Sequence, residues 1–374
     1  MRFFPFTSFR VRMTSFSFCH SEPKAKNLFI FYLNMDVSFL MPSYNNEATV
    51  VNSIQSVLNQ KTDLKFEIIF VDDGSTDNTY YLAEKFLNPP LFPPLVKGGE
   101  GGFKLIQKNN GGEASALNEG LKYCSGKFIA IVEADVEIEE RWLEKVMREF
   151  TPPPHLPPQV GEEKGGGYIA GVGGRLVTPE NSSWIAKIAG YEIESKFETK
   201  ERYANHITSA NAIYRAEVFK KIGSFNENLV NAVLDSDLNR RIIEKGYKLI
   251  YSKDASALHH FKPTFKGYLK RQYSYARYRV HERLALYPAD RFLALNVFIC
   301  GLSALSLLLI PFTTRLPVTL LLLSIILQFP TTFKLLKMKR DSVLYLYPFI
   351  IVIRNIVGVF GYGIGVINKG LNRY

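Results

Sequence analysis

Cysteine is scarce in this sequence, which has three such residues among 374. Cys19, Cys124 and Cys300 are far apart and odd in number. They therefore give no disulfide framework and no Cys-x-x-Cys pair of the kind that binds zinc. A chain that folds without disulfides is typical of a reducing compartment. We expect the main folded part of this protein to lie in one.

A convincing signal peptide is also missing. The first apolar run, residues 28–33, is short, and no small-residue cleavage site follows it. Residues 1–34 have no sustained hydrophobic period, and Met35 stands just before the first clear strand. We expect residues 1–34 to be an extraneous or disordered extension, with a membrane-touching arm as the alternative.

Acidic side chains are fewer than basic ones, 35 against 46, which gives a formal net charge of +11. No zinc finger, basic zipper or other nucleic-acid module accompanies this excess, so we expect no nucleic-acid partner. The basic residues are dense between Lys262 and Arg291, directly before an uncharged apolar stretch. Such a collar favours an anionic membrane surface, and we predict membrane lipids as partners.

Long apolar runs occupy the carboxyl-terminal part, residues 286–374. The uncharged segments 292–310 and 316–333 are about long enough to cross a bilayer as helices. A third segment, 343–367, is interrupted by Arg354 and several glycines. We expect the first two segments to span, and the third either to span or to lie partly in the interface.

The charges between these segments predict their orientation. The loop after the second segment carries Lys334, Lys337, Lys339 and Arg340, whereas the loop before it carries only Arg315. Because cytoplasmic loops are enriched in Lys and Arg, the second loop and the preceding domain are expected in the cytoplasm. The prediction is a multi-pass protein of the inner or plasma membrane.

Before residue 286, short apolar strands alternate with helical patterns. This alternation predicts βαβ units, a mostly parallel sheet flanked by helices, and the α/β class. The first expected strands are 37–41, 68–71, 103–107 and 128–132. Two low-complexity inserts, 89–102 and 152–167, carry paired prolines followed by glycine clusters, and they are expected to be surface loops.

One strand ends in two carboxylates. The apolar run 68–71 leads directly into Asp72, Asp73 and a Gly-Ser-Thr-Asp turn. In open α/β sheets, ligands bind outside the carboxyl ends of the strands, so these carboxylates lie where a nucleotide is expected. Ordinary turn and helix-cap chemistry is the alternative explanation.

Several motifs in chain order resemble glycosyltransferase family 2 of the GT-A fold. The motifs are segments 38–47, 71–77, 109–120, 133–135, 208–214 and 234–241. The resemblance covers about residues 36–280 and implies a GT-A domain at 35–285. It implies an inverting enzyme that moves a sugar from a UDP- or GDP-linked donor to a lipid-linked or growing glycan acceptor. Residues 268–278 and the apolar segments are similar to the branch that makes exported polysaccharides.

The resemblance also implies a set of residues that contact the donor. This set is Pro42, Tyr44, Glu47, Asp72, Asp73, Asn118 and Glu133. A carboxylate such as Asp73 can accept a hydrogen bond from a ring N–H of the base, and Asp72 either does the same or holds the turn. Tyr44 is expected to stack on the base.

Glu133-Ala134-Asp135 matches the Asp-x-Asp motif of the family, with Glu in the first position. Carboxylates suit Mg²⁺ or Mn²⁺, and Asp135 is the stronger candidate ligand, although a solvated acidic loop would have the same composition. His259 or His260 would complete the site, because only one of two adjacent strand residues can face it.

Asp235 matches the general base of inverting members, which takes a proton from the acceptor hydroxyl. A helix N-cap is its structural alternative. The chain departs from the family at Glu113, Glu133 and Leu234, and residues 268–278 lack the Gln-x-x-Arg-Trp motif of processive relatives. Two other functions remain open: a polyprenyl-phosphate sugar synthase, and a catalytically inactive, membrane-anchored nucleotide-sugar binder.

Overall fold

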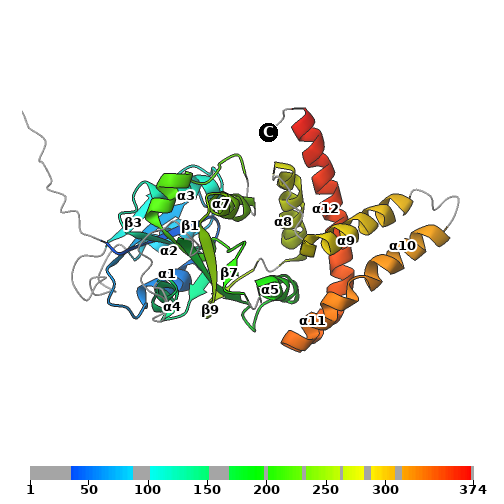
Figure 1. Ribbon diagram of the computed structural model, residues 1–374, viewed down its shortest axis with the longest axis horizontal. Helices are drawn as coiled ribbons and strands as arrows, with labels where there is room; N and C mark the ends of the chain where they lie inside the picture. The colour runs from blue at the N-terminus through cyan, green and yellow to red at the C-terminus, as the bar shows by residue number, and fades with distance from the viewer. Residues whose placement is uncertain are drawn as a thin grey trace, which may run out of the picture. The chain divides into compact units, whose positions relative to one another are not determined.

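The computed structural model describes residues 35–86, 102–150, 168–197, 201–229, 233–261, 264–281, 288–307 and 314–371 (Figure 1). The expected extension, residues 1–34, and nearly all of both inserts lie outside the described residues. Asn34–Tyr374 form one compact unit, so the expected boundary near residue 285 stays a prediction.

The described residues contain one sheet of nine strands, in the order β3-β2-β1-β4-β8-β6-β9-β5, with β7 paired to β9. The strands are β1 Val37–Ser43, β2 Phe66–Asp72, β3 Phe103–Gln107, β4 Phe128–Val132, β5 Val136–Ile138, β6 Ile169–Val177, β7 Tyr203–Ala204, β8 Asn211–Arg215 and β9 Lys248–His259. The α/β class is therefore confirmed.

Strand direction divides the sheet into two parts. β1 to β4 are parallel, as expected from the alternating pattern. β8 runs antiparallel to both β4 and β6, whereas β6 and β9 are parallel. The sheet is thus mixed beyond β4. β9 pairs with β6 on both sides of two register shifts and so forms one strand of 12 residues.

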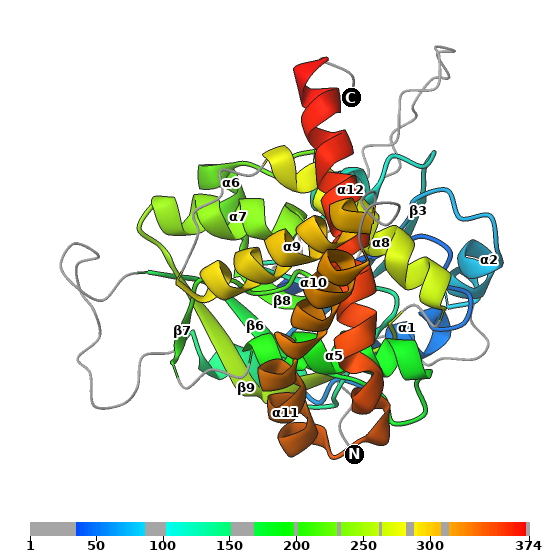
Figure 2. The ribbon, with the colours of Figure 1, turned by 90° about the vertical axis from the view of Figure 1, so that its right-hand side faces the viewer.

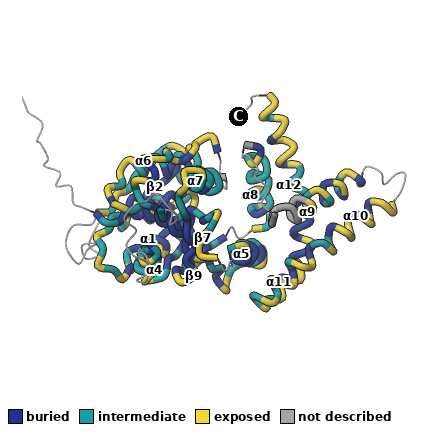
Figure 3. The backbone as a smooth tube through the Cα atoms, viewed as in Figure 1, coloured by how far each residue is buried: buried dark blue, intermediate teal, exposed yellow. Residues whose placement is uncertain are grey.

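Helices cover both faces of the sheet. They are α1 Val50–Leu58, α2 Thr79–Glu84, α3 Glu113–Leu121, α4 Trp142–Arg148, α5 Trp184–Phe197, α6 Ala216–Ile222 and α7 Val233–Glu244. The next helix, α8 Phe265–Tyr278, packs against the carboxyl-terminal helices instead. Alternation along β1 sends Phe39 and Met41 into one core with α1 and α4, and Leu40 into the other with α3 and α7. Figure 3 shows the buried sheet between them.

The carboxyl-terminal part is helical, with α9 Pro288–Ser306, α10 Arg315–Ile326, α11 Phe329–Lys339 and α12 Tyr347–Gly370. Two stretches, Arg315–Lys339 and Ser342–Gly370, are long and apolar enough to cross a membrane by length and composition. The second expected segment extends further than its run 316–333, because Pro330 lies in the first turn of α11, where proline is tolerated.

The sequence leaves the third segment open between spanning and lying partly in the interface, and residues 308–310 of the first lie outside the described residues. The third forms the longest helix among the described residues despite Arg354. The described part of the first contributes only a short apolar helix, Val297–Ser306. Figure 1 and Figure 2 both show α12 beside α8, and side chains from α5, α8, α11 and α12 share a third apolar core.

Candidate functional site

The site lies at the carboxyl ends of β1, β2 and β4, where three loops are bound to one another. Asp73 N donates to Ser43 O (2.9 Å), and Ala134 N donates to Pro42 O (3.4 Å). Asn45, which has a positive φ of 54°, accepts from Thr76 N (2.8 Å). These bonds hold the segment after β1 against the segments after β2 and β4.

Tyr44 and Glu47 belong to the first of these loops. The Tyr44 side chain is exposed, as a stacking platform must be before a ligand arrives. Glu47 instead accepts from the backbone N (3.2 Å) and the side chain (3.1 Å) of Asn78. Glu47 therefore joins two loops in this structure, and its contact with a donor stays a prediction.

Asp72 and Asp73 are both buried but have different surroundings. Asp73 accepts from Lys108 Nζ (2.7 Å), Gly111 N (3.0 Å) and Gly112 N (2.7 Å). Asp72 accepts from Ser75 N (3.1 Å) through Oδ2, while its Oδ1 has no hydrogen-bond partner in the described part of the chain. Asp72 thus keeps a vacant acceptor beside the strand end.

An open cleft of about 550 Å³ lies at the ends of β2 and β3. It is lined by Gly74, Ser75, Gln107, Lys108 and Asn109. The cleft adjoins the Asp73 turn, because Lys108 belongs to both. Its position is the one that the strand-end rule predicts for a nucleotide.

The acidic turn after β4 forms a candidate metal centre. Ligand atoms of Glu133, Asp135 and His259 all lie within 4.8 Å of one another. His259 Nε2 is 3.6 Å from Asp135 Oδ1, which is buried and accepts no hydrogen bond from the described residues. Two carboxylates and an imidazole at this separation fit a small divalent cation.

The two histidines point to different partners. His259 joins the acidic pair, whereas His260 Nε2 lies 2.6 Å from Glu137 Oε1, outside that group. Alternation along β9, paired with β5, separates the adjacent side chains. Of the two alternatives left open by the sequence, the structure brings His259 to the candidate centre.

Further charged groups surround this centre. Burial raises the pKa of Glu113 to about 7, and the nearby Asp235 adds to the effect. Burial also raises the pKa of Glu133, and the negative charges of Glu113 and Asp135 raise it further. Four carboxylates thus share one region, and this concentration of negative charge helps to raise the pKa of Glu113 and of Glu133. Such a site attracts a cation.

Helix α8 supplies one cation of its own. Arg271 contacts the hydroxyl of Tyr275. The pKa of Arg271 is raised by Tyr275 and, against the opposing effect of burial, by Glu133 and Asp135. From the sequence, the Arg- and Tyr-rich stretch 268–278 either clamps the diphosphate or rests on the membrane surface, and the structure brings its Arg271 into the field of the acidic centre. The signal in the sequence for a cation near the site was a basic residue on an aromatic-rich helix directly after the last strand.

Asp235 lies in the first turn of α7, and its Oδ1 is buried without a hydrogen-bond partner among the described residues. Its electrostatic influence reaches Glu113, Glu133 and His206. An N-cap would use its side-chain oxygen on the helix backbone. The vacant oxygen of Asp235 is therefore available for a ligand.

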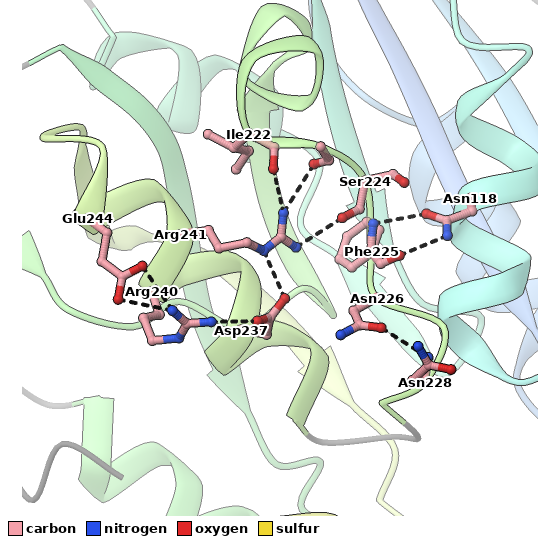
Figure 4. A network of polar contacts seen from close by, with 11 residues as sticks. Asn118, Ile222, Ser224, Phe225, Asn226, Asn228, Asp237, Arg240, Arg241 and Glu244 are labelled. Carbon is pink, nitrogen blue, oxygen red and sulfur yellow. Dashed lines mark hydrogen bonds and ion pairs between the residues drawn. The ribbon is translucent and has the colours of Figure 1, made fainter. Parts of the chain in front are cut away.

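Asn118 has a structural role that the sequence did not predict. Figure 4 shows its amide bonded to the loop after α6. Asn118 Nδ2 donates to Phe225 O (2.9 Å) and Glu227 Oε1 (2.8 Å), and Phe225 N donates to Asn118 Oδ1 (2.9 Å). The predicted donor contact of Asn118 gains no support from this geometry.

The same loop is held from α7. Asp237 pairs with Arg240 (2.9 Å) and Arg241 (2.8 Å) (Figure 4). Arg241 in turn donates to Ile222 O (2.8 Å) and Ser224 O (2.9 Å). These contacts tie the last turn of α7 to the loop that Asn118 of α3 also holds, and Asp235 lies in the first turn of the same helix.

The glycosyl transferase family 2 model matches residues 38–223. The chain belongs to glycosyl transferase family 2. The match begins in β1 and includes the strand-end loops and the acidic turn described above. The prediction of a glycosyltransferase with a GT-A fold is therefore confirmed.

Curated relatives of this family 2 chain act in glycan synthesis. It is 25% identical over 246 residues to glycosyltransferase AglE of Haloferax volcanii, covering 63% of this chain and 70% of that protein. It is 39% identical over 100 residues to the UDP-Glc:alpha-D-GlcNAc-diphosphoundecaprenol beta-1,3-glucosyltransferase WfgD of Escherichia coli. This match covers 26% of this chain and 34% of that protein.

A solved structure shows the same fold. The mannosyltransferase PcManGT from Pyrobaculum calidifontis, in complex with GDP-Man and Mn²⁺, superposes with a TM-score of 0.58 at 16% identity. The superposition covers 88% of this chain and 87% of that chain. It therefore extends beyond the residues that the family model matches.

Proposed function

We propose that this chain is an inverting, metal-dependent glycosyltransferase of the cytoplasmic membrane face. Its donor would be a UDP- or GDP-linked sugar and its acceptor a lipid-linked or growing glycan, in the synthesis of cell-surface or exported polysaccharide. The observation that carries the proposal is the group of Glu133, Asp135 and His259, whose ligand atoms lie within 4.8 Å of one another. Asp235, with its vacant oxygen, adjoins the same acidic region.

Donor binding would use the loops around the cleft. Asp72 Oδ1 has a free lone pair for a ring N–H of the base, whereas Asp73 is fully engaged with Lys108 and the glycine turn. The exposed ring of Tyr44 would then cover the base. Under this proposal, Asp72 selects the base and Asp73 shapes the pocket wall.

The metal would be held by Asp135 and His259, with Glu133 as a further ligand. Mn²⁺ or Mg²⁺ bound there would neutralise charge on the departing nucleoside diphosphate. Arg271 lies in the same field and would face the diphosphate from α8. The excess of carboxylates over cations in the ligand-free chain supports this assignment.

Asp235 would act as the general base. It takes the proton of the acceptor hydroxyl while that oxygen attacks the anomeric carbon, and the bond from this carbon to the diphosphate breaks on the opposite face. The structure gives Asp235 no hydrogen-bond partner for Oδ1 among the described residues, so this oxygen can receive a proton. The family's partner carboxylate is absent, since residue 234 is leucine.

The proposal is tested with membranes that contain the full chain, a panel of UDP- and GDP-sugars, and Mn²⁺. We expect release of UDP or GDP that EDTA abolishes. Asp235→Asn should slow release about 10²- to 10⁴-fold, the usual effect of losing a general base. Asp135→Ala should abolish it, and the exposed Glu140→Gln serves as the matched control.

Product analysis separates the competing functions. Label in a glycan or lipid diphosphate supports the proposal, whereas label in a polyprenyl monophosphate identifies a sugar synthase instead. Tight donor binding without nucleotide release, unchanged in Asp235→Asn, would mean that the chain is an inactive binder.

A further inference from the structure

A second cavity, of about 230 Å³, lies between the sheet and helix α11. It is lined by Arg175 of β6, Tyr251 and Lys253 of β9, Glu194 of α5, and Met338 and Lys339 of α11. Lys253 precedes His259 by six residues in β9, a separation of up to roughly 20 Å along an extended strand. The cavity and the acidic centre share no residue, so the cavity is a distinct site.

Cations outnumber anions in this lining, and one cation is already neutralised. Lys339 forms an ion pair with Glu194 and lies 5.0 Å from the centre of the Tyr191 ring. Glu194 also accepts from the backbone N (2.9 Å) and Oγ1 (2.7 Å) of Thr178. These contacts fix Lys339 as a rigid wall of the cavity.

Arg175 and Lys253 are different. Both side chains are exposed, and neither forms an ion pair within the described part of the chain. Together they leave an excess of two positive charges beside the cavity. The volume is far above the roughly 15 Å³ that one water needs on this measure, so a group larger than a water fits.

The position of the cavity indicates the source of its ligand. The apolar stretch Arg315–Lys339 ends at the cavity wall. Phe329 and Phe333 are exposed on the turns of α11 before it, and Lys337 follows them. Aromatic side chains followed by lysines are typical of a helix that leaves the bilayer at head-group depth. Met338 adds an apolar surface beside the cations.

We propose that this cavity binds the phosphate of an anionic membrane lipid. Arg175 and Lys253 contact the phosphate, Lys339 and Tyr251 form the fixed walls, and Met338 contacts the lipid next to its head group. The proposal rests on the membrane attachment under the proposed function but not on sugar transfer. A chain without transferase activity would still show lipid binding, so the two proposals fail separately.

The test is a titration of the full chain in detergent with dihexanoyl-phosphatidylglycerol, followed by the thermal unfolding midpoint. Dihexanoyl-phosphatidylcholine and inorganic phosphate are the parallel arms. We expect the phosphatidylglycerol to raise the midpoint more than either. The Arg175→Gln/Lys253→Gln variant should bind it about 30-fold more weakly, from the usual contribution of two basic residues at a lipid surface.

Two further variants make the result specific. Lys220→Gln/Lys245→Gln removes two exposed charges elsewhere and should bind like the wild type. Arg175→Lys/Lys253→Arg keeps the charges and should restore most of the binding. Equal binding by the Gln variant and the wild type would overturn the proposal. So would equal stabilisation by phosphatidylcholine, or inorganic phosphate as effective as the anionic lipid.

Discussion

At the scale of single residues, the charge on Glu113 matters most for the candidate centre. It is the first residue of α3 and follows Gly112, whose φ of +87° favours glycine. Asp73 accepts from the N–H groups of Gly111 and Gly112 and so fixes this turn. The Asp73 carboxylate therefore also places Glu113 among Glu133, Asp135 and Asp235.

Glu113 predicts a pH dependence of stability. Its pKa is raised from 4.5 to about 7 in the folded chain, first by burial and then by Asp235. The folded state therefore binds a proton more tightly than the unfolded state. This contribution is complete below pH 4.5 and is lost as the pH rises through 7, with a slope of at most about 1.4 kcal/mol per pH unit.

Thermal unfolding in EDTA between pH 4.5 and 8 measures this effect. The unfolding midpoint of Glu113→Gln should vary less with pH over that window than the midpoint of the wild type. The exposed Glu140→Gln should show the same pH dependence as the wild type. The raised pKa of Glu113 would be contradicted if the wild-type midpoint rose steadily with pH and Glu113→Gln followed the same profile.

At the scale of elements, α12 braces the helix that carries Arg271. Gly361 and Gly365 face α8, where an added Cβ would lie 2.6 Å from Tyr273 O and 2.2 Å from Arg277 O. Gly363, on the same helix, has no atom within 4 Å of such a position. The two glycines allow a close approach that any side chain would prevent.

This geometry predicts opposite effects of one substitution. In an open helical position, Gly363→Ala should be neutral or stabilising by up to about 1 kcal/mol. Gly365→Ala should cost about 1–3 kcal/mol through overpacking, and it should lower transfer because α8 shifts with Arg271. Thermal unfolding and nucleotide release measure both. Equal behaviour of the two variants would show that α12 does not set the position of α8.

Elements also show what the sequence could predict. The four parallel strands were predictable because each short apolar run ends in a polar turn, which is local information. The antiparallel strand β8 and the short strand β5 depend on pairing with distant segments. Glu113 and Arg271 reach the acidic centre from positions 158 residues apart, so no local pattern could place them together.

At the scale of the whole molecule, ion pairs connect the sheet and its helices to the carboxyl-terminal helices. Arg354 interrupts an apolar segment and looked unfavourable for a membrane helix. In the structure it pairs with Glu192 of α5 (2.5 Å), next to Asn355. Asp341 likewise pairs with Lys187 (3.1 Å). The arginine that interrupts the apolar segment therefore joins α12 to α5, two elements that the sequence places in different parts of the chain.

The Glu192–Arg354 pair gives a stability prediction with a defined sign. Burial alone would raise the pKa of Glu192, but Arg354 and Lys196 outweigh it and lower the pKa to about 2. This stabilisation is present above pH 4.5 and is lost as the pH falls toward 2. Arg354→Met leaves a buried carboxylate without its main partner, which typically costs about 3–5 kcal/mol.

Replacing both partners separates the pair from its surroundings. Glu192→Gln/Arg354→Met should lose less stability than Arg354→Met, because no uncompensated charge remains. Arg240→Met breaks two partly exposed pairs, with Asp237 and Glu244, and should cost about 0–1 kcal/mol for each. Lowering the pH from 7 to 4 should stabilise Arg354→Met relative to the wild type, since its unpaired Glu192 then gains a proton. The measurement is thermal unfolding in detergent. If Arg354→Met is not stabilised relative to the wild type at pH 4, the Glu192–Arg354 pair does not join the two parts of the molecule.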